Sequence, residues 1–361
     1  MCHDTAATVI HLDGSQHSGS GTLVRFGVSL AALVGEPLHI TRARSRRPKP
    51  GLRAQHVASL QACAALCAGS AEGATVGSQE ITFVPGSRIH GGAYDFEIGT
   101  AGSTTMLALG ILPLACFADA PVTATIVGGV FQDFAPSPHH FQQVLLPTLA
   151  AMGVEAELEI LRAGYPPAGA GRLLLRVRPL RGALHPLERV TPGRVRAVSG
   201  VAFASHLAER RVAARMAESC RNALAAGGLT SQIECVEDES ATQAGANLAV
   251  WAHTETGCRI GADRAGARGR SSESIGRGVA QSLLEDLASG AATDRHLADQ
   301  LVLFAALAEG RSRWTLPRVT EHVESNVWLV GLFGVRARCD GRTVRVEGLG
   351  QVRRSASQAA D

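Results

Sequence analysis

A recurring succession of short strand, polar turn and helix constrains the fold of this chain most. Val9–Leu12 is followed by a small-residue turn and by the helical apolar spacing of Thr22–Val34. Tyr94–Ile98 leads in the same way through Thr100–Thr105 into the apolar stretch Met106–Phe117. A single unit of this kind cannot bury its apolar face alone, so units stack on one another. The sequence therefore predicts an α+β chain of repeated α/β units, although the units share negligible sequence identity.

The recurrence breaks at Arg181–Pro192, where Gly, Pro and His are frequent. The region that follows predicts two helices and a few strands, and its glycine-rich segment Ile260–Arg270 predicts a turn. About a hundred residues is an ordinary size for a compact domain. We therefore expect a large domain from residues 1–185 and 288–361, and a smaller inserted α/β domain from residues 186–287.

A basic loop at Arg42–His56 holds six Lys and Arg residues and no acidic residue, whereas the whole chain carries a formal charge of only +3. Pro48 and Pro50 exclude this loop from a helix interior. A helix is predicted to begin near Gln55, and the free N–H groups of a helix N-terminus suit an anion, as do forked arginine donors. A solvated basic loop is the alternative. The two prolines and the trailing Gln55–His56 pair favour a phosphate site.

The turn at Asp13–Gly21 joins a strand to a helix, a geometry that brings backbone N–H groups to a phosphate. It lacks the spacing of a P-loop, and many glycine turns bind nothing. Arg25 is predicted in the first turn of the helix, where a cation opposes the helix dipole. That unfavourable placement indicates that Arg25 faces an anion.

Two segments near the C-terminus carry further candidates. His296, Asp299 and Gln300 are three to four residues apart and so share one helical face, which a solvated surface would explain equally well. His322 follows Thr320, a residue that can cap a helix N-terminus. A helix N-terminus lowers the pKa of a histidine and leaves a neutral imidazole available to attack. The alternative for His322 is a purely structural histidine at a helix start.

No segment predicts membrane insertion or secretion. Met1–Asp13 has no long apolar run, and the longest apolar stretch, Met106–Ala118, is too short to span a bilayer and contains Pro113. The eight cysteines form no paired C-x-x-C set, so we expect reduced thiols and a cytoplasmic location. The polar tail Gln351–Asp361 is expected to lack order.

The basic loop reads RARSRRPKPGLRAQH and resembles the RNA 3'-terminal phosphate cyclase family. The resemblance covers roughly Val9–Val344. Its other motifs are the GTAGSTT turn at 99–105, Phe134–Pro138, Gly164–Gly171, the GADRAGARGR segment at 261–270, the HLADQ stretch at 296–300 and His322–Asn326. The resemblance implies three α/β repeats, related to those of the EPSP synthases, with an insertion in this place.

The resemblance also implies an activity. Such an enzyme uses ATP to convert an RNA 3'-phosphate into a 2',3'-cyclic phosphodiester through a covalent adenylyl-histidine, here on His322. The residues implied for ATP binding are His296, Leu297, Ala298, Asp299 and Gln300. Those implied for the phosphate and the RNA end are Arg25, Arg44, Arg47, Gln55 and His56. A divalent metal, Mg²⁺ or Mn²⁺, is expected with ATP, and base specificity is not.

Three positions depart from the family pattern. Ser18 replaces a glutamate thought to help hold the metal or the nucleotide, Thr22 replaces a glutamine, and Leu109 replaces a glutamine that touches ATP. The metal ligands are therefore unassigned. Two alternatives stay open: a degenerate, non-catalytic paralogue that binds RNA ends or partners, and an enolpyruvyl transferase on the same architecture. Ser18 and Leu109 favour the paralogue, whereas His322 opposes it.

Overall fold

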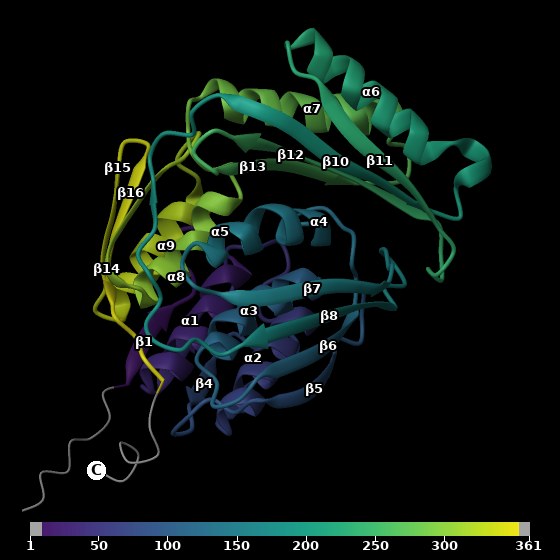
Figure 1. Cartoon of the computed structure of the whole chain (residues 1–361). Coiled ribbons are helices and arrows are strands. Elements are labelled where there is room, and N and C mark those ends of the chain that lie inside the picture. The colour runs from purple at the N-terminus through teal and green to yellow at the C-terminus, as the bar shows by residue number, and fades with distance from the viewer. Residues whose placement is uncertain (1–8, 354–361) are drawn as a thin grey trace, which may run out of the picture.

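The computed structural model describes residues 9–353, whose strands form four four-stranded sheets. Three almost fully buried helices, α1 (Gly21–Val34), α3 (Thr104–Cys116) and α8 (Leu297–Leu307), lie between the sheets (Figure 1). No helix among the described residues has the length and apolar content needed to cross a bilayer. Most of the predicted disordered tail, from residue 354 on, lies outside the described residues.

The first repeat sets a pattern of four strands and two helices. Its remaining elements are β1 (Ile10–Asp13), β2 (Leu38–Thr41), α2 (Ala54–Cys67), β3 (Ser70–Glu72) and β4 (Ile81–Val84). β1 pairs in parallel with β2, and β4 pairs antiparallel with both β2 and β3, which gives the order β1-β2-β4-β3. Parallel neighbours need a crossover connection, which α1 provides.

The second repeat has the same strand order, β5-β6-β8-β7, and the same directions. Its strands are β5 (Gly92–Glu97), β6 (Val122–Gly128), β7 (Glu155–Arg162) and β8 (Gly171–Arg178), with α3 as the crossover. Its second helix is built from α4 (Pro138–His140), the π-helical η1 (Phe141–Leu145) and α5 (Leu146–Ala150). A proline clashes with the carbonyl four residues earlier, so the wider turn before Pro147 accommodates the predicted interruption.

The third repeat is split by the insertion. Its elements are β9 (Glu188–Arg189), α8, β14 (Glu309–Thr315), α9 (Glu321–Leu332), β15 (Arg336–Asp340) and β16 (Thr343–Leu349). β9 is parallel to β14, and β16 is antiparallel to both β14 and β15, so the pattern of the first two repeats returns. The prediction of repeated α/β units is confirmed.

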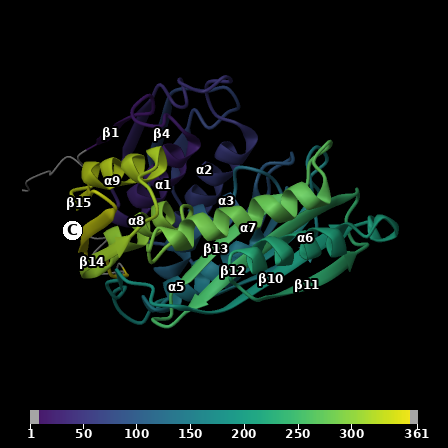
Figure 2. The ribbon, with the colours of Figure 1, turned by 90° about the horizontal axis from the view of Figure 1, so that it is seen from above.

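The segment between β9 and α8 forms an inserted unit with its own sheet and apolar core. Its elements are β10 (Val195–Ser205), η2 (Ala208–Arg210), α6 (Val212–Ala226), β11 (Ser231–Asp238), β12 (Gly245–Thr254), β13 (Arg259–Ala265) and α7 (Ser272–Ala288). The strand order differs from that of the repeats, β11-β10-β12-β13, and α6 and α7 cover one face of the sheet (Figures 1 and 2). We propose this unit as the inserted domain, beginning after β9 rather than at residue 186, because β9 pairs with β14.

The predicted turn at Ile260–Arg270 was wrong in its first half, because Ile260–Ala265 belongs to β13. In that strand the absence of a side chain on Gly261 permits the close approach of His140, and no turn is formed there. A Cβ atom there would lie 2.8 Å from the Cδ2 atom of His140, which approaches from α4.

A buried ion pair joins the inserted unit to the repeats. The Nε2 atom of His140 lies 3.1 Å from the Oδ2 atom of Asp294, and their side chains are 2% and 0% exposed. The same carboxylate accepts from the backbone N–H groups of Gly261, His296 and Leu297. Burial opposes both charges, yet mutual attraction prevails, since the pKa of His140 is raised and that of Asp294 is lowered.

Asp294→Ala is expected to destabilise the fold by about 3 kcal/mol or more, because it leaves a buried histidine and three N–H groups without their acceptor. Urea unfolding at pH 6 would measure the loss. Asp340→Ala, which removes an exposed carboxylate, is the matched control and should change stability little. The loss should shrink in acid, because the depressed pKa of Asp294 makes its stabilisation fade as pH falls. Equal losses in both variants would contradict the assigned role.

Candidate active site

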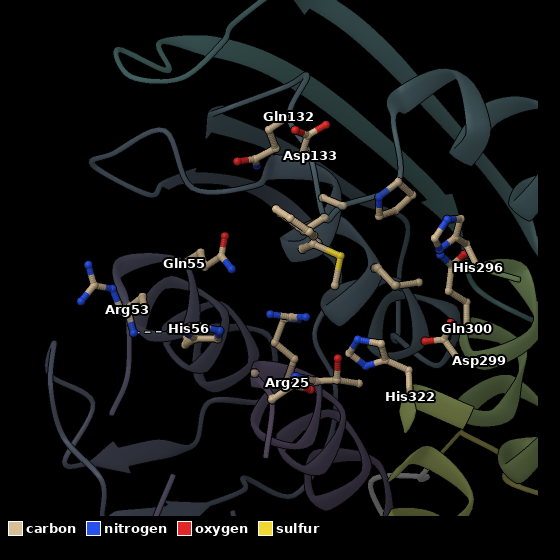
Figure 3. A pocket seen from close by; sticks show the side chains of 18 of the residues that line it. Arg25, Arg53, Gln55, His56, Gln132, Asp133, His296, Asp299, Gln300 and His322 are labelled. Carbon is tan, nitrogen blue, oxygen red and sulfur yellow. Dashed lines mark hydrogen bonds between the residues drawn. The ribbon is translucent and has the colours of Figure 1, made fainter. Parts of the chain in front are cut away.

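A cavity of about 740 Å³ lies where the helices of all three repeats begin. Its wall is formed by the N-terminal ends of α1, α2, α3, α8 and α9, by the basic loop, and by residues of β12 and β13 from the inserted unit (Figure 3). Each helix N-terminus carries positive partial charge on its unpaired N–H groups. Their convergence favours a negatively charged ligand before any side chain is considered.

All predicted site residues except Leu297 and Ala298 line this cavity. The side chains of Leu297 and Ala298 are buried in the core, at 1% and 0% exposure. The helical period directs them away from the cavity, which the neighbouring His296 and Asp299 line. The carbonyl of Ala298 instead accepts from the indole N–H of Trp314 at 3.1 Å. The structure thus places the side chains of Leu297 and Ala298 in the core and not in the cavity wall.

His322 is the second residue of α9. Thr320 caps the helix by accepting from the N–H of Val323 at 3.2 Å, and buried Val323 and Val330 anchor it. The pKa of His322 is lowered mainly by burial and further by the guanidinium groups of Arg47 and Arg25. Its Nδ1 atom is buried and has no hydrogen-bond partner among the described residues. The ring is therefore neutral at neutral pH and available as a nucleophile.

Arg25 is the fifth residue of α1, one position beyond the predicted first turn, since Ser20 caps a helix that begins at Gly21. Only 5% of Arg25 is exposed, and its buried Nε has no partner within residues 9–353. Burial, and then the charge of Arg44, lower its pKa to about 10, while Asp299 acts in the opposite direction. A buried guanidinium with a free donor at a cavity wall fits an anionic ligand.

Asp299 and Gln300 form the wall contributed by α8. Burial, and then the charge of Asp294, raise the pKa of Asp299 to about 7, against the lowering effects of Arg25 and His140. At neutral pH its carboxyl group can therefore donate or accept a hydrogen bond. The Oε1 atom of Gln300 is buried without a partner in the described part of the chain. This wall thus offers polar groups that the protein itself does not satisfy.

His56 and Gln55 begin α2 on the other side of the cavity (Figure 3). The Nδ1 atom of His56 accepts from the N–H of Arg53 at 3.0 Å, which makes its Nε2 the donor. Burial, and then Arg25 and Arg44, lower its pKa to about 2, so this ring is neutral too. A Cβ atom on Gly21 would lie 1.9 Å from that Nε2, so only glycine fits beneath it. Gln55 accepts from the N–H of Ser103 at 2.9 Å, which leaves its amide NH₂ for a ligand.

The arginines of the basic loop divide into two groups. Arg42 pairs with Asp13, and Arg46 donates to the carbonyl of His17, so both brace the loop against the turn at 13–21. Arg44 and Arg47 line the cavity. Arg44 also donates to the carbonyls of Lys49 and Gly51, which fixes its position. Arg53 lines the cavity as well. The loop is thus held by backbone carbonyls and by the carboxylate of Asp13, and three of its arginines lie at the cavity wall.

Ser18 joins the turn at 13–21 to α9 and is not among the residues that line the cavity. Its hydroxyl lies 3.0 Å from that of Ser20 and 2.8 Å from that of Ser325, and its N–H donates to Ser325, which ties the turn to α9. No group of three or more His, Cys, Asp or Glu residues within the described chain could hold a metal ion. The residues present thus do not form a protein-held metal site where the family pattern would have put a carboxylate.

Sequence reasoning missed several residues of the cavity wall. These are Gln132, Asp133, Asn247, Asp263 and Arg264. Asn247 comes from β12, which was predicted as a strand, whereas Asp263 and Arg264 come from the part of β13 that was predicted as a turn. Neither pattern shows that these residues meet the repeats. Phe134 belongs to the recognised motif Phe134–Pro138 but was not predicted as a site residue. An aromatic side chain in a Pro-rich turn was the signal that could have indicated its place in the cavity wall.

Convergent helix N-termini, the buried Arg25 with the half-buried Arg44 and Arg47, and a neutral histidine together suit an enzyme site for phosphate esters. Comparison with known proteins makes this specific. The family model described as RNA 3'-terminal phosphate cyclase matches residues 16–338. The RNA 3'-terminal phosphate cyclase of Methylococcus capsulatus is 38% identical over 94% of this chain and 97% of its own length. That of Archaeoglobus fulgidus is 37% identical over 94% of this chain and 98% of its own length. The chain belongs to the RNA 3'-terminal phosphate cyclase family.

Proposed function

We propose that this protein cyclises RNA 3'-phosphate ends at the expense of ATP, with His322 as the covalent nucleophile. The observation that carries the proposal is a half-buried His322 whose pKa is lowered by burial and by the charges of Arg47 and Arg25, in a cavity that these arginines and several helix N-termini line. Each step of such a reaction is a nucleophilic substitution at phosphorus that develops negative charge on the phosphate oxygens. Cations held in fixed positions stabilise that charge. The retained histidine also argues against the non-catalytic paralogue.

In the first step an imidazole nitrogen of His322 attacks the α-phosphorus of ATP. The new N–P bond replaces the bond to the bridging oxygen, and pyrophosphate leaves with that oxygen. Asp299, Gln300 and His296 on α8 would hold the nucleotide, and Arg25 would bind the oxygens that gain charge. Leu109 on α3 also lines the cavity, and its apolar side chain offers no hydrogen bond.

In the second step an oxygen of the RNA 3'-phosphate attacks the phosphorus of the adenylate, and the N–P bond to His322 breaks. In the third, the 2'-OH attacks the RNA phosphorus, loses its proton and displaces AMP. Arg44, Arg47, Gln55 and His56 would orient the RNA end. Reading an end and its 2'-OH requires no base-specific contacts.

A divalent cation, Mg²⁺ or Mn²⁺, stays a prediction. No step above is routed through one, since the described residues contain no group of three or more His, Cys, Asp or Glu that could hold it. A cytoplasmic location likewise stays a prediction.

The proposal is tested with RNA that ends in a 3'-phosphate, ATP labelled at the α-phosphate, and Mg²⁺ or Mn²⁺. We expect acid-labile label on the protein, release of labelled AMP, and an RNA end that resists phosphatase. With a 2'-deoxy terminal nucleotide, adenylated RNA should accumulate, since no 2'-OH is present to close the ring. A 3'-phosphate that stays sensitive to phosphatase in the first substrate would refute the proposal.

The pH dependence of adenylation should reveal the lowered pKa of His322. At saturating ATP, the single-turnover rate should be constant from pH 8 down to about 6.5, the ordinary histidine pKa, and fall only in more acid solution. Burial and the nearby arginines lower the pKa of His322, so the nucleophile becomes protonated only at a pH below the ordinary histidine pKa. Asp299→Asn separates any contribution of the Asp299 titration. A rate that is already half lost at pH 7 in both proteins would contradict the neutral histidine.

A further inference from the structure

Phe134 is exposed at the cavity wall in an unfavourable conformation. Its side chain is 106% exposed, although phenylalanine is normally buried, and it lines the cavity. Its φ of 65° lies in the left-handed region, which is rare for a bulky residue. Such strain persists only where the surrounding contacts over-determine the backbone, and it is typical of ligand-binding positions.

The contacts that hold Phe134 come from the inserted unit. The guanidinium group of Arg270 binds both carboxylate oxygens of Asp133, at 3.0 and 2.9 Å. On the other side of Phe134, the N–H of Ser137 donates to Asp263 at 2.6 Å. The loop is thus fixed at two points by β13 and the turn that follows it, which presents the aromatic ring from a rigid support.

A buried, unsatisfied amide lies in the same wall. Asn247 on β12 is 1% exposed and lines the cavity, and its Nδ2 has no hydrogen-bond partner among residues 9–353. Asn247 pairs with Ala265, whose carbonyl accepts from Arg270, the residue that holds Asp133. Buried amides are normally paired, so this donor is available to a ligand that enters beside Phe134.

An exposed aromatic face and an unpaired amide donor in one cavity suit a nucleoside. We propose, building on the function above, that Phe134 and Asn247 form a subsite for the 3'-terminal nucleoside of the RNA. The ring of Phe134 stacks on the base, and Asn247 donates one hydrogen bond to the same nucleoside. Stacking of this kind accepts every base, since all present a π-face.

The position of Phe134 at the Asp133 end of the loop favours RNA rather than the adenine of ATP. The segment that leads into the loop is tied to the turn beside Gln55, because Gly129 donates to Gly102 at 2.8 Å and Ser103 donates to Gln55. Figure 3 shows Gln132 and Asp133 across the cavity from His322, away from the α8 wall of His296 and Gln300. A nucleotide with its phosphate near His322 and Gln55 would therefore direct its base toward Phe134.

The test measures binding without ATP, so that no turnover occurs. Fluorescence anisotropy compares a labelled RNA ending in a 3'-phosphate with the same RNA whose terminal nucleotide is abasic. Phe134→Ala should weaken binding of the complete RNA about tenfold and leave the abasic RNA unchanged, whereas Phe134→Trp should retain affinity. Asn247→Ala should show a smaller loss. Leu349→Ala, at an exposed apolar residue outside the cavity, is the matched control.

Two results would overturn the subsite: equal effects of Phe134→Ala on both RNAs, or no effect on either. A third arm measures the ATP concentration that half-saturates labelling of the protein in the absence of RNA. An increase in that concentration with unchanged RNA binding would assign Phe134 to adenine and also overturn the proposal. Absence of label on the wild-type protein would refute the proposed function alone, since the binding comparison needs no adenylation.

Discussion

His322→Ala is expected to abolish covalent labelling by ATP and to reduce cyclisation by about 10⁴-fold or more, because loss of the nucleophile removes the only covalent route. The fold should survive, since Thr320 still caps α9 and the buried valines of that helix are untouched. Denaturing electrophoresis after incubation with α-labelled ATP measures the first effect. Glu324→Ala, on the exposed face of the same helix, is the control and should label like the wild type.

A bypass substrate separates a nucleophile from a structural histidine. RNA that already carries AMP on its 3'-phosphate needs only the attack of its own 2'-OH. His322→Ala should convert this RNA to the cyclic product at a rate within about tenfold of wild type, because the cations that stabilise the last step remain. If the variant failed equally on both substrates while staying folded, His322 would be a positioning residue instead of the nucleophile.

The repeat architecture could be predicted only in part from the sequence. Helices such as Gly21–Val34 and Ser272–Ala288 have continuous apolar spacing, and the predicted bounds agree with the structure within two residues. The sequence did not predict the strands of the sheet in the third repeat. Glu309–Thr315 and Arg336–Asp340 are rich in arginine and acidic residues, because one face of that sheet meets solvent. Glu309–Thr315 owes its strand character to pairing with β16, a non-local contact that a local pattern does not contain. Arg336–Asp340 forms a hairpin with β16 through Gly341 and Arg342.

The site was predictable where its residues belong to local motifs. The basic loop and the starts of α2, α8 and α9 each combine a helix N-terminus with polar residues, a signal that lies within a few positions of the sequence. Asn247 gave no such signal, because it reaches the cavity only where β12 of the inserted unit begins. Ser325 lies in the recognised motif at 322–326, but nothing local predicts its contact with Ser18, 307 positions away. Only the packed repeats bring these residues together.

Arg25→Met is expected to reduce adenylation by about 10² to 10³-fold, because a buried cation aimed at developing phosphate charge is lost. Its effect on stability should be small or favourable. Burial and Arg44 already disfavour the charged guanidinium in the folded protein, as its lowered pKa shows, so an apolar side chain of similar length removes an electrostatic cost. The pKa of Asp299 should rise above about 7 when Arg25 is removed, and a protonated Asp299 tolerates the loss of its counter-charge.

Thermal unfolding at pH 6 and pH 8 tests whether Arg25→Met loses adenylation while it keeps its stability. The melting temperature of Arg25→Met should equal or exceed that of the wild type at pH 6, where Asp299 is largely protonated, and the advantage should shrink at pH 8, where an ionised Asp299 would lack its partner cation. Arg25→Lys should recover part of the activity, since it restores the charge without the forked donors. A variant that lost stability and activity together at pH 6 would show that Arg25 is a structural cation. A variant with intact adenylation would remove it from the catalytic site altogether.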